Sequence, residues 1–380
     1  MKTASTIVNA QKIADSLPST TCFIQPYAPH PGDISYPDKD RHQQHRLSFP
    51  IDIEQHPDRS LIALIGLLDR HREITDLNLN AYYCQQPELS VLPSLAPLQN
   101  LRLLNLEQNA LTNWGDIPLL KQLEVLGLKN NQLSSIPNNI HTLTKLRELS
   151  LGHNPITVLP DSLTRLAKLR RLLLVGNPIS TLPKNMSGLR SLEELEMSSG
   201  SFRPLPFSHV PNSLFSLPKL RCCTIHHAQL TTLPTSISQA RSLMELSITQ
   251  TQIKAIPSLH SLPLRILVLS ENQLQRFDAS GLSELIELDL CENQLTALQG
   301  LDDLSVIQKI DLSGNRLNSL PSMRTLSKLR SLNIAYNPIQ QLPDLRGLSS
   351  LEEVLISNDM SPNIVRKSIS SKVRVRTVHY

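Results

Sequence analysis

Apolar residues recur at a near-constant stride through most of the chain, in the pattern Leu-x-x-Leu-x-Leu-x-x-Asn-x-Leu. One copy comprises Leu123, Leu126, Leu128, Asn131 and Leu133. Leucines at the fourth and sixth positions have the period of a short strand with one buried face. Asn at the ninth position suits a tight turn, because its amide can hydrogen-bond backbone groups of its own and the next coil.

Twelve copies of this pattern follow one another in phase, and a degenerate copy starting at Ile74 precedes them. A single copy cannot bury its leucines, but stacked copies can, since each contacts its neighbours. The pattern therefore predicts parallel strands spaced about 4.8 Å apart along one wall. The twelve copies begin at Leu101, Leu123, Leu146, Leu169, Leu192, Leu220, Leu243, Leu264, Leu285, Ile307, Leu329 and Leu351.

The repeat resembles the leucine-rich repeat superfamily, in particular its intracellular subclass with 21–23 residues per copy, which also occurs in bacterial effector proteins. The resemblance implies an α/β solenoid: a horseshoe with a parallel concave β-sheet, a helical N-terminal cap and a helix–strand C-terminal cap. We expect a flexible leader at residues 1–45, the helical cap at 46–73, the repeat array at 74–358 and the C-terminal cap at 359–380.

Composition narrows the class of protein. The chain has 71 Leu but only 13 aromatic residues, which indicates many similar core layers. Its five cysteines are odd in number and scattered, which argues against a disulfide framework and for a reducing compartment. We find neither a secretory signal nor an apolar run near the roughly 18 residues of a membrane helix. We therefore expect a cytoplasmic protein, or one delivered into a host cell without a cleavable Sec signal.

Acidic residues are concentrated where the resemblance implies a solvent-facing concave wall. The wall positions lie two, four, six and seven residues after the first leucine of each copy. In the twelve copies these positions hold eleven carboxylates and three cations, although the net charge of the chain is +4. Like charges on neighbouring strands cost free energy, so we interpret the wall as a docking face for a basic protein surface. The alternative is that solvated carboxylates merely keep the sheet soluble. The candidate binding residues are Glu148, Arg171, Glu194, Glu196, Cys222, His226, Glu245, Glu287, Asp289 and Asp311.

The repeat is interrupted near residues 198–230. One step lengthens to 28 residues, and three successive Asn positions hold Gly200, Ala228 and Thr251. Phe202 and Phe207 fall in this stretch. They either form an exposed anchor loop for a partner or fill the volume that a larger loop leaves in the convex layer.

Cys222 and His226 are expected on the wall beside Glu194 and Glu245. Such a group is a conceivable zinc or catalytic cluster. No further Cys or His converges on it in the sequence pattern, so we expect no metal, no cofactor, no small-molecule substrate and no enzymatic activity.

A basic ladder is expected along one rim, where Lys or Arg recurs directly before and after the first leucine of many copies. It could contact phosphates or an anionic membrane surface. Few aromatics accompany these cations to stack on bases, so we do not expect nucleic-acid binding. Membrane contact is expected only through this peripheral basic edge.

The sequence thus favours a non-enzymatic scaffold that docks a basic protein on its acidic wall. The Ser/Thr-rich segment from Thr3 to Thr21 resembles the leaders of bacterial effectors. Some of those effectors carry a ubiquitin-ligase domain, for which we see no room here. The alternatives are a substrate-recruiting subunit of a ubiquitin-ligase complex and a phosphate or membrane-edge binder.

Overall fold

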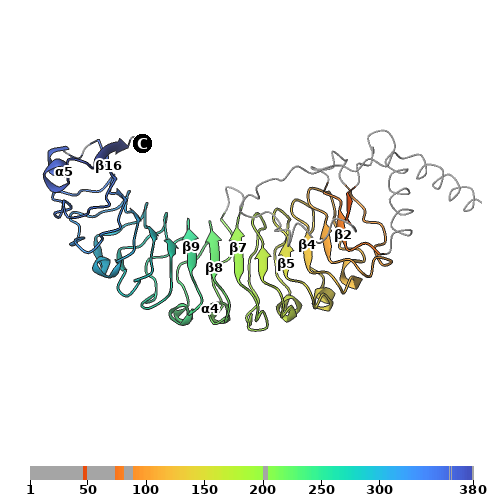
Figure 1. The fold of residues 1–380 in the computed structure, drawn as a ribbon. Helices are drawn as coiled ribbons and strands as arrows, with labels where there is room; N and C mark the ends of the chain where they lie inside the picture. Colours follow the sequence, from red (N-terminus) through yellow and green to blue (C-terminus); the bar gives the residue numbers. More distant parts are fainter. Residues whose placement is uncertain are drawn as a thin grey trace, which may run out of the picture. The chain divides into compact units, whose positions relative to one another are not determined.

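The computed structural model describes residues 46–48, 73–80, 89–199, 204–358, 360 and 362–378. The chain divides into two compact units. Unit 1 runs to Ile179 and includes Gly188–Leu192, whereas unit 2 comprises Ser180–Ser187 and Glu193–Tyr380. Each unit is a stack of coils whose strands run parallel and side by side (Figure 1).

In unit 1 each strand pairs in parallel with the next one along the chain, so the coils stack in sequence order. Equivalent leucines face each other in the ladder, for example Leu104, Leu126 and Leu149. The strands are β1 (Arg46–Ser48), β2 (Asp76–Asn78), β3 (Leu103–Asn105), β4 (Val125–Gly127), β5 (Glu148–Ser150) and β6 (Arg171–Leu173).

Unit 2 continues the same pattern, with the strand order β7-β8-β9-β10-β12-β14-β15-β16-β17. A separate parallel pair is formed by β11 (Arg276–Asp278) and β13 (Ala297–Gln299). The strands of the main ladder are β7 (Glu194–Ser198), β8 (Cys222–His226), β9 (Glu245–Thr249), β10 (Ile266–Val268), β12 (Glu287–Asp289), β14 (Lys309–Asp311), β15 (Ser331–Asn333), β16 (Glu353–Ser357) and β17 (Arg374–Val378).

The strands fall where the repeat predicts them. From β2 to β16, every main-ladder strand begins two residues after the first apolar residue of its copy. The repeated leucines, such as Leu123, Leu126 and Leu128, are fully buried between coils. The predicted solenoid with a long parallel sheet is therefore confirmed.

The segment opposite the strand differs between copies. Three of the four copies with a 23-residue step turn through a short 3-10 helix: η3 (Asn138–Thr142), η4 (Asp161–Arg165) and η5 (Thr235–Gln239). In the shorter copies that start at Leu264 and Leu285, the strands β11 and β13 follow the turn at the repeat asparagine. The remaining short elements are η2 (Ile117–Leu119), α4 (Asn212–Phe215) and η6 (Leu301–Asp303).

The repeat asparagines form a buried ladder between coils. The Nδ2 group of Asn131 donates to the carbonyls of Leu128 in its own coil (3.0 Å) and Leu106 in the preceding coil (2.9 Å). Its Oδ1 accepts the backbone N–H of Leu111, also in the preceding coil, at 3.0 Å. The asparagine therefore satisfies backbone groups of its own and the preceding coil, whereas the sequence analysis assigned it to the next coil.

Strand length follows this asparagine. From the Leu101 copy onward, the eight copies with Asn at the ninth position have strands of three residues. The four copies without it, which contain β7, β8, β9 and β16, have strands of five residues. Without an amide to turn the chain, the ladder continues, and His226 pairs with Thr249. Buried backbone groups are thus hydrogen-bonded either by the asparagine amide or by a longer strand ladder.

Elements beyond the repeats are described in part. Residues 1–45 and 49–72, and with them most of the expected N-terminal cap, lie outside the described residues. Arg46–Ser48, expected at the start of that helical cap, form strand β1 instead. After the last repeat come helix α5 (Pro362–Ser368) and strand β17, which pairs with β16. The helices of the described regions are all too short or too polar to cross a membrane.

Candidate docking wall

The excess of carboxylates over cations on the wall lies in unit 2. The wall positions of unit 1 carry two carboxylates, Glu107 and Glu148, and two cations, Lys129 and Arg171. The wall positions of unit 2 carry nine carboxylates and a single cation, Lys309. The negative potential predicted for the array therefore arises from unit 2 alone.

In unit 1 one of the two wall carboxylates is buried and paired with a cation. Glu148 is only 4% exposed, and Arg171 of the neighbouring strand lies 3.3 Å from its carboxylate. Leu103 and Val125, also at wall positions, form a small buried apolar cluster. The expectation that Glu148 faces solvent as a binding residue is therefore wrong.

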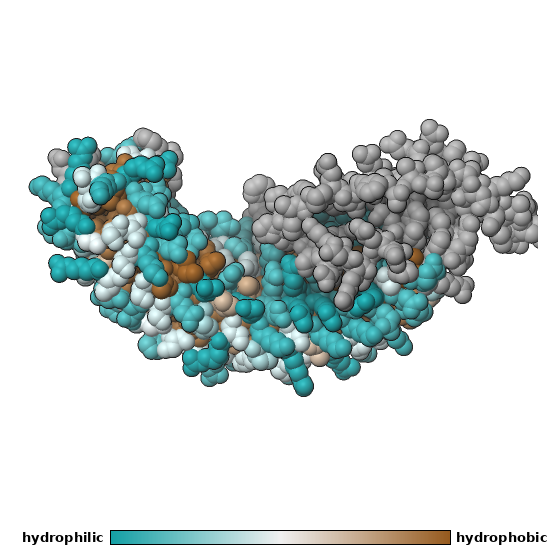
Figure 2. All heavy atoms as spheres, in the orientation of Figure 1, coloured by the Kyte–Doolittle hydropathy of each residue, from teal (hydrophilic) through white to brown (hydrophobic). Residues whose placement is uncertain are grey.

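In unit 2 the first part of the wall covers the three long strands β7, β8 and β9. The ladder places Glu194, Cys222 and Glu245 side by side. Glu245 is exposed, and Glu194 and Glu196 are half-buried. The face of unit 2 seen in Figure 2 is mostly hydrophilic, with some apolar patches. This part of the wall offers several carboxylates within one flat, parallel sheet.

Cys222 and His226 lie on this sheet as expected, but their environment does not activate them. Burial, the charges of Glu245 and Glu194, and a hydrogen bond to Glu245 raise the pKa of the Cys222 thiol to about 12. Burial lowers the pKa of His226, whose Nδ1 is hydrogen-bonded to the Thr249 hydroxyl at 2.5 Å. A protonated thiol is a poor nucleophile and a poor metal ligand, so the arrangement favours a binding surface over a catalytic one.

We predict that Cys222 is almost inert toward alkylation at pH 8. With its pKa raised to about 12, the thiolate fraction is about a thousandfold below that of a free cysteine. Iodoacetamide labelling followed by peptide mass spectrometry should show a rate at least about 100-fold below that of the same cysteine in urea-unfolded protein. Labelling at a similar rate in both states would contradict the protonated, carboxylate-bonded thiol.

The second part of the wall follows β12 and β14. Lys309 Nζ donates to Glu287 at 2.7 Å, and this bond raises the pKa of the lysine. Burial raises the pKa of Asp289. Asp311 accepts hydrogen bonds from the backbone and hydroxyl of Ser313 and from Asn333 Nδ2. Glu287 is thus paired with a cation, whereas the hydrogen-bond donors to Asp311 are neutral groups.

Three side chains here approach one another in a way the sequence analysis missed. Ligand atoms of Asp289, Cys291 and Asp311 all lie within 4.8 Å of one another, a geometry that could hold a cation. The visible signal was Asp-x-Cys beginning at the last residue of β12, with Asp311 on β14 paired to Asp289. However, Asp289 already accepts the Cys291 N–H, and Asp311 is used by Ser313 and Asn333. We assign no metal to them.

In the interrupted stretch, Phe207 is a core residue and not an exposed anchor. Phe207 is 1% exposed, as is Phe215, so an anchor role for Phe207 is wrong and the packing alternative holds for it. Its ring fills the layer opposite the strands, where the 28-residue step adds volume. Phe202 lies outside the described residues.

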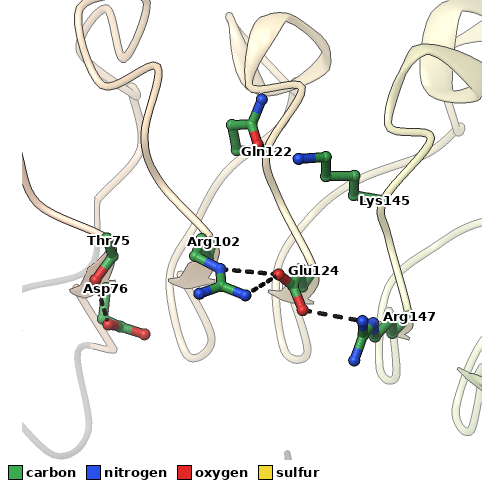
Figure 3. Close-up of polar contacts among 7 residues, drawn as sticks. All are labelled: Thr75, Asp76, Arg102, Gln122, Glu124, Lys145 and Arg147. Atoms are coloured by element: carbon green, nitrogen blue, oxygen red, sulfur yellow. Dashed lines mark hydrogen bonds and ion pairs between the residues drawn. The ribbon is translucent and has the colours of Figure 1, made fainter. Parts of the chain in front are cut away.

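The basic rim of unit 1 is bridged by a carboxylate. Glu124 lies between Arg102 and Arg147, each on an adjacent coil, and contacts both: Arg102 Nε donates at 2.8 Å, and Arg147 Nε lies 3.4 Å away (Figure 3). Lys145 donates to Gln122 on the same rim. On this part of the rim one carboxylate thus pairs with two of the three cations, and the third, Lys145, has a neutral acceptor.

These features are those of a leucine-rich repeat solenoid. Two family models match it: a leucine-rich repeat region over residues 79–204 and a leucine rich repeat over residues 263–317. The interrupted stretch lies largely between the two matches. No curated protein matches the sequence.

Solved structures share the fold at low sequence identity. An internalin from Listeria monocytogenes is 21% identical with a TM-score of 0.66, and the match covers 82% of this chain and 89% of the internalin. A Leptospira interrogans leucine-rich repeat protein is 24% identical with a TM-score of 0.56, covering 84% and 92%. The ectodomain of the Arabidopsis thaliana receptor kinase GASSHO1/SCHENGEN3, in complex with CASPARIAN STRIP INTEGRITY FACTOR 2, is 24% identical with a TM-score of 0.58, covering 81% and 39%.

Proposed function

We propose that the protein is a non-enzymatic scaffold that docks a protein partner with a basic surface on the wall of unit 2. The observation that carries this proposal is the charge division: nine carboxylates and one cation at the wall positions of unit 2, against two of each in unit 1. A sheet that needed carboxylates only for solubility would need them in both units. Complementary charge on a rigid wall speeds encounter and selects the partner.

Related structures support binding as the use of such a fold. The plant receptor kinase ectodomain was solved in complex with CASPARIAN STRIP INTEGRITY FACTOR 2, and another plant receptor, RGFR1, was solved with RGF2. Leucine-rich repeat proteins are typically non-catalytic, and the raised pKa of Cys222 agrees with that.

The test is charge reversal on the wall. The triple variant Glu194→Lys, Glu245→Lys and Glu287→Lys should bind the partner at least about 100-fold more weakly, because attraction at three sites becomes repulsion. Partners are captured from lysate with wild-type protein, identified, and their affinity is then measured with purified components at two salt concentrations.

A matched control makes the same change of charge elsewhere. Asp161, Glu284 and Asp302 are exposed carboxylates away from the wall, and their replacement by Lys should leave affinity within about twofold. Equal binding by wild type, wall variant and control would mean that the wall carboxylates serve solvation. Loss of binding in both variants would point to net charge rather than to this face.

The setting in which the scaffold acts is part of the same proposal. An effector delivered into a host cell is supported by the composition of the segment from Thr3 to Thr21, and a cytoplasmic role by the free cysteines. A translocation reporter fused to residues 1–45 distinguishes them. A substrate-recruiting role in ubiquitin transfer would appear as a ligase subunit among the captured partners.

A further inference from the structure

A hollow of about 420 Å³ opens on the rim of unit 2, at the start of strands β8 and β9. Its cations are Lys219, Arg221 and Arg241, which come from two consecutive coils. Glu193 is the carboxylate among its eight lining residues. Three cations and one carboxylate around a concave space give a local positive potential.

At the equivalent rim of unit 1 a carboxylate pairs with the neighbouring arginines. There, the residue after the first leucine is Arg102, Glu124 and Arg147 in three consecutive copies, and the glutamate bridges both arginines (Figure 3). In unit 2 the corresponding triplet is Arg221, Met244 and Arg265. A methionine thus stands where the bridging carboxylate stands in unit 1.

The consequence is visible in the contacts of Arg221. Its Nη2 lies 3.3 Å from Met244 Sδ, a weak acceptor, instead of a carboxylate oxygen. Arg241 Nη1 makes one long hydrogen bond, 3.5 Å, to the carbonyl of Ser261. Over the part of the chain that the structure describes, no ion pair is recorded for Lys219, Arg221 or Arg241. Their charge remains available to a ligand.

The lining also has apolar surface. Pro218, Met244 and Pro263 contribute it beside the cations. A bare anion would leave most of a hollow of this volume unfilled, whereas an anion carried on a short aliphatic stem would also cover the apolar part. A carboxylate is neutralised by one arginine, but a phosphate monoester carries nearly two charges and three acceptor oxygens.

We propose that this hollow binds a phosphate monoester dianion, held by Arg221 and Arg241 through hydrogen bonds and by Lys219 through its charge. This site is independent of the docking wall: it uses other residues and the opposite charge. The same chemistry could be offered by free phosphate or by a phosphorylated side chain of a protein, and the apolar lining favours the latter.

The test measures binding of two probes to the full-length protein by calorimetry at pH 7.5, where the monoester is mostly dianionic. The probes are the tripeptide Gly-phosphoserine-Gly and inorganic phosphate, with unphosphorylated Gly-Ser-Gly as the blank. Wild-type protein should bind the phosphopeptide saturably, and the double variant Arg221→Gln, Arg241→Gln should bind it at least tenfold more weakly. Both arginines are exposed, so the variant is expected to fold.

Two further variants sharpen the result. Arg102→Gln with Arg147→Gln removes the same charge from the bridged rim of unit 1 and should leave affinity within twofold. Met244→Glu introduces the carboxylate of unit 1 and should weaken binding at least tenfold at an unchanged melting temperature. Tighter binding of the phosphopeptide identifies a protein source, and equal binding of phosphate identifies the free ion. Absence of saturable binding of either probe, or equal binding by the Arg221/Arg241 variant, overturns the proposal.

Discussion

Replacing Asn293 by Ala is expected to lower the free energy of unfolding by about 2–5 kcal/mol. The side chain is 7% exposed and hydrogen-bonds four backbone groups: its Nδ2 donates to the carbonyls of Leu269 (2.9 Å), Leu290 (3.1 Å) and Cys291 (3.1 Å), and its Oδ1 accepts the N–H of Leu274 (3.0 Å). Alanine leaves these groups buried without the amide. Urea denaturation followed by circular dichroism measures the change.

An exposed asparagine provides the control. Asn318→Ala lies in the same unit, and the change should stay within about 0.5 kcal/mol. The chain also shows how the loss of a repeat asparagine can be tolerated. Ala228 occupies the equivalent position naturally, and there strand β8 simply continues for two more residues. A loss below about 0.5 kcal/mol for Asn293→Ala would mean that β12 lengthens in the same way.

Leu151→Ala is expected to cost about 2–5 kcal/mol, because it leaves a cavity in a stack that cannot collapse along its length. Leu151 is fully buried, and the equivalent residues of the adjacent coils, Leu128 and Leu174, are fully buried as well. Since each coil contacts only its neighbours, the loss should be local. Hydrogen exchange should therefore show lower protection in the Leu146 copy and the copies beside it.

The contrast is with an apolar residue that faces water. Leu119 is 48% exposed, so Leu119→Ala should change stability by less than about 0.5 kcal/mol. Equal effects of the two substitutions would show that the register of the repeat is misplaced by at least one residue.

The strands were predictable because the period of the leucines fixes which positions share a buried face. The same period could not show which wall charges are neutralised, since that depends on contacts between copies. Glu148 illustrates this: it belongs to the acidic set by position, yet Arg171 at the same position of the next copy neutralises it. The pairing was visible in principle, as opposite charges at one repeat position in consecutive copies.

Other features needed the structure. The strands β7, β8 and β9 are longer because their copies have Gly200, Ala228 and Thr251 in place of the repeat asparagine. The sequence shows these replacements, but it does not show that they lengthen the strands. The contact of Arg221 with a sulfur atom instead of a carboxylate follows from Met244, which occupies the rim position that Glu124 holds in unit 1. Side-chain size and burial decided the role of Phe207, which the pattern had left open.

The reach of the asparagine ladder has a consequence for how such a chain changes over generations. Each amide joins its own coil to the preceding one, and Asn293, Asn315 and Asn337 do so through the same atoms. A gene segment encoding one 22-residue turn could therefore be duplicated or lost, and the flanking joints would re-form on the new neighbour. Growth by whole modules would alter the length of the binding surface while leaving its construction intact.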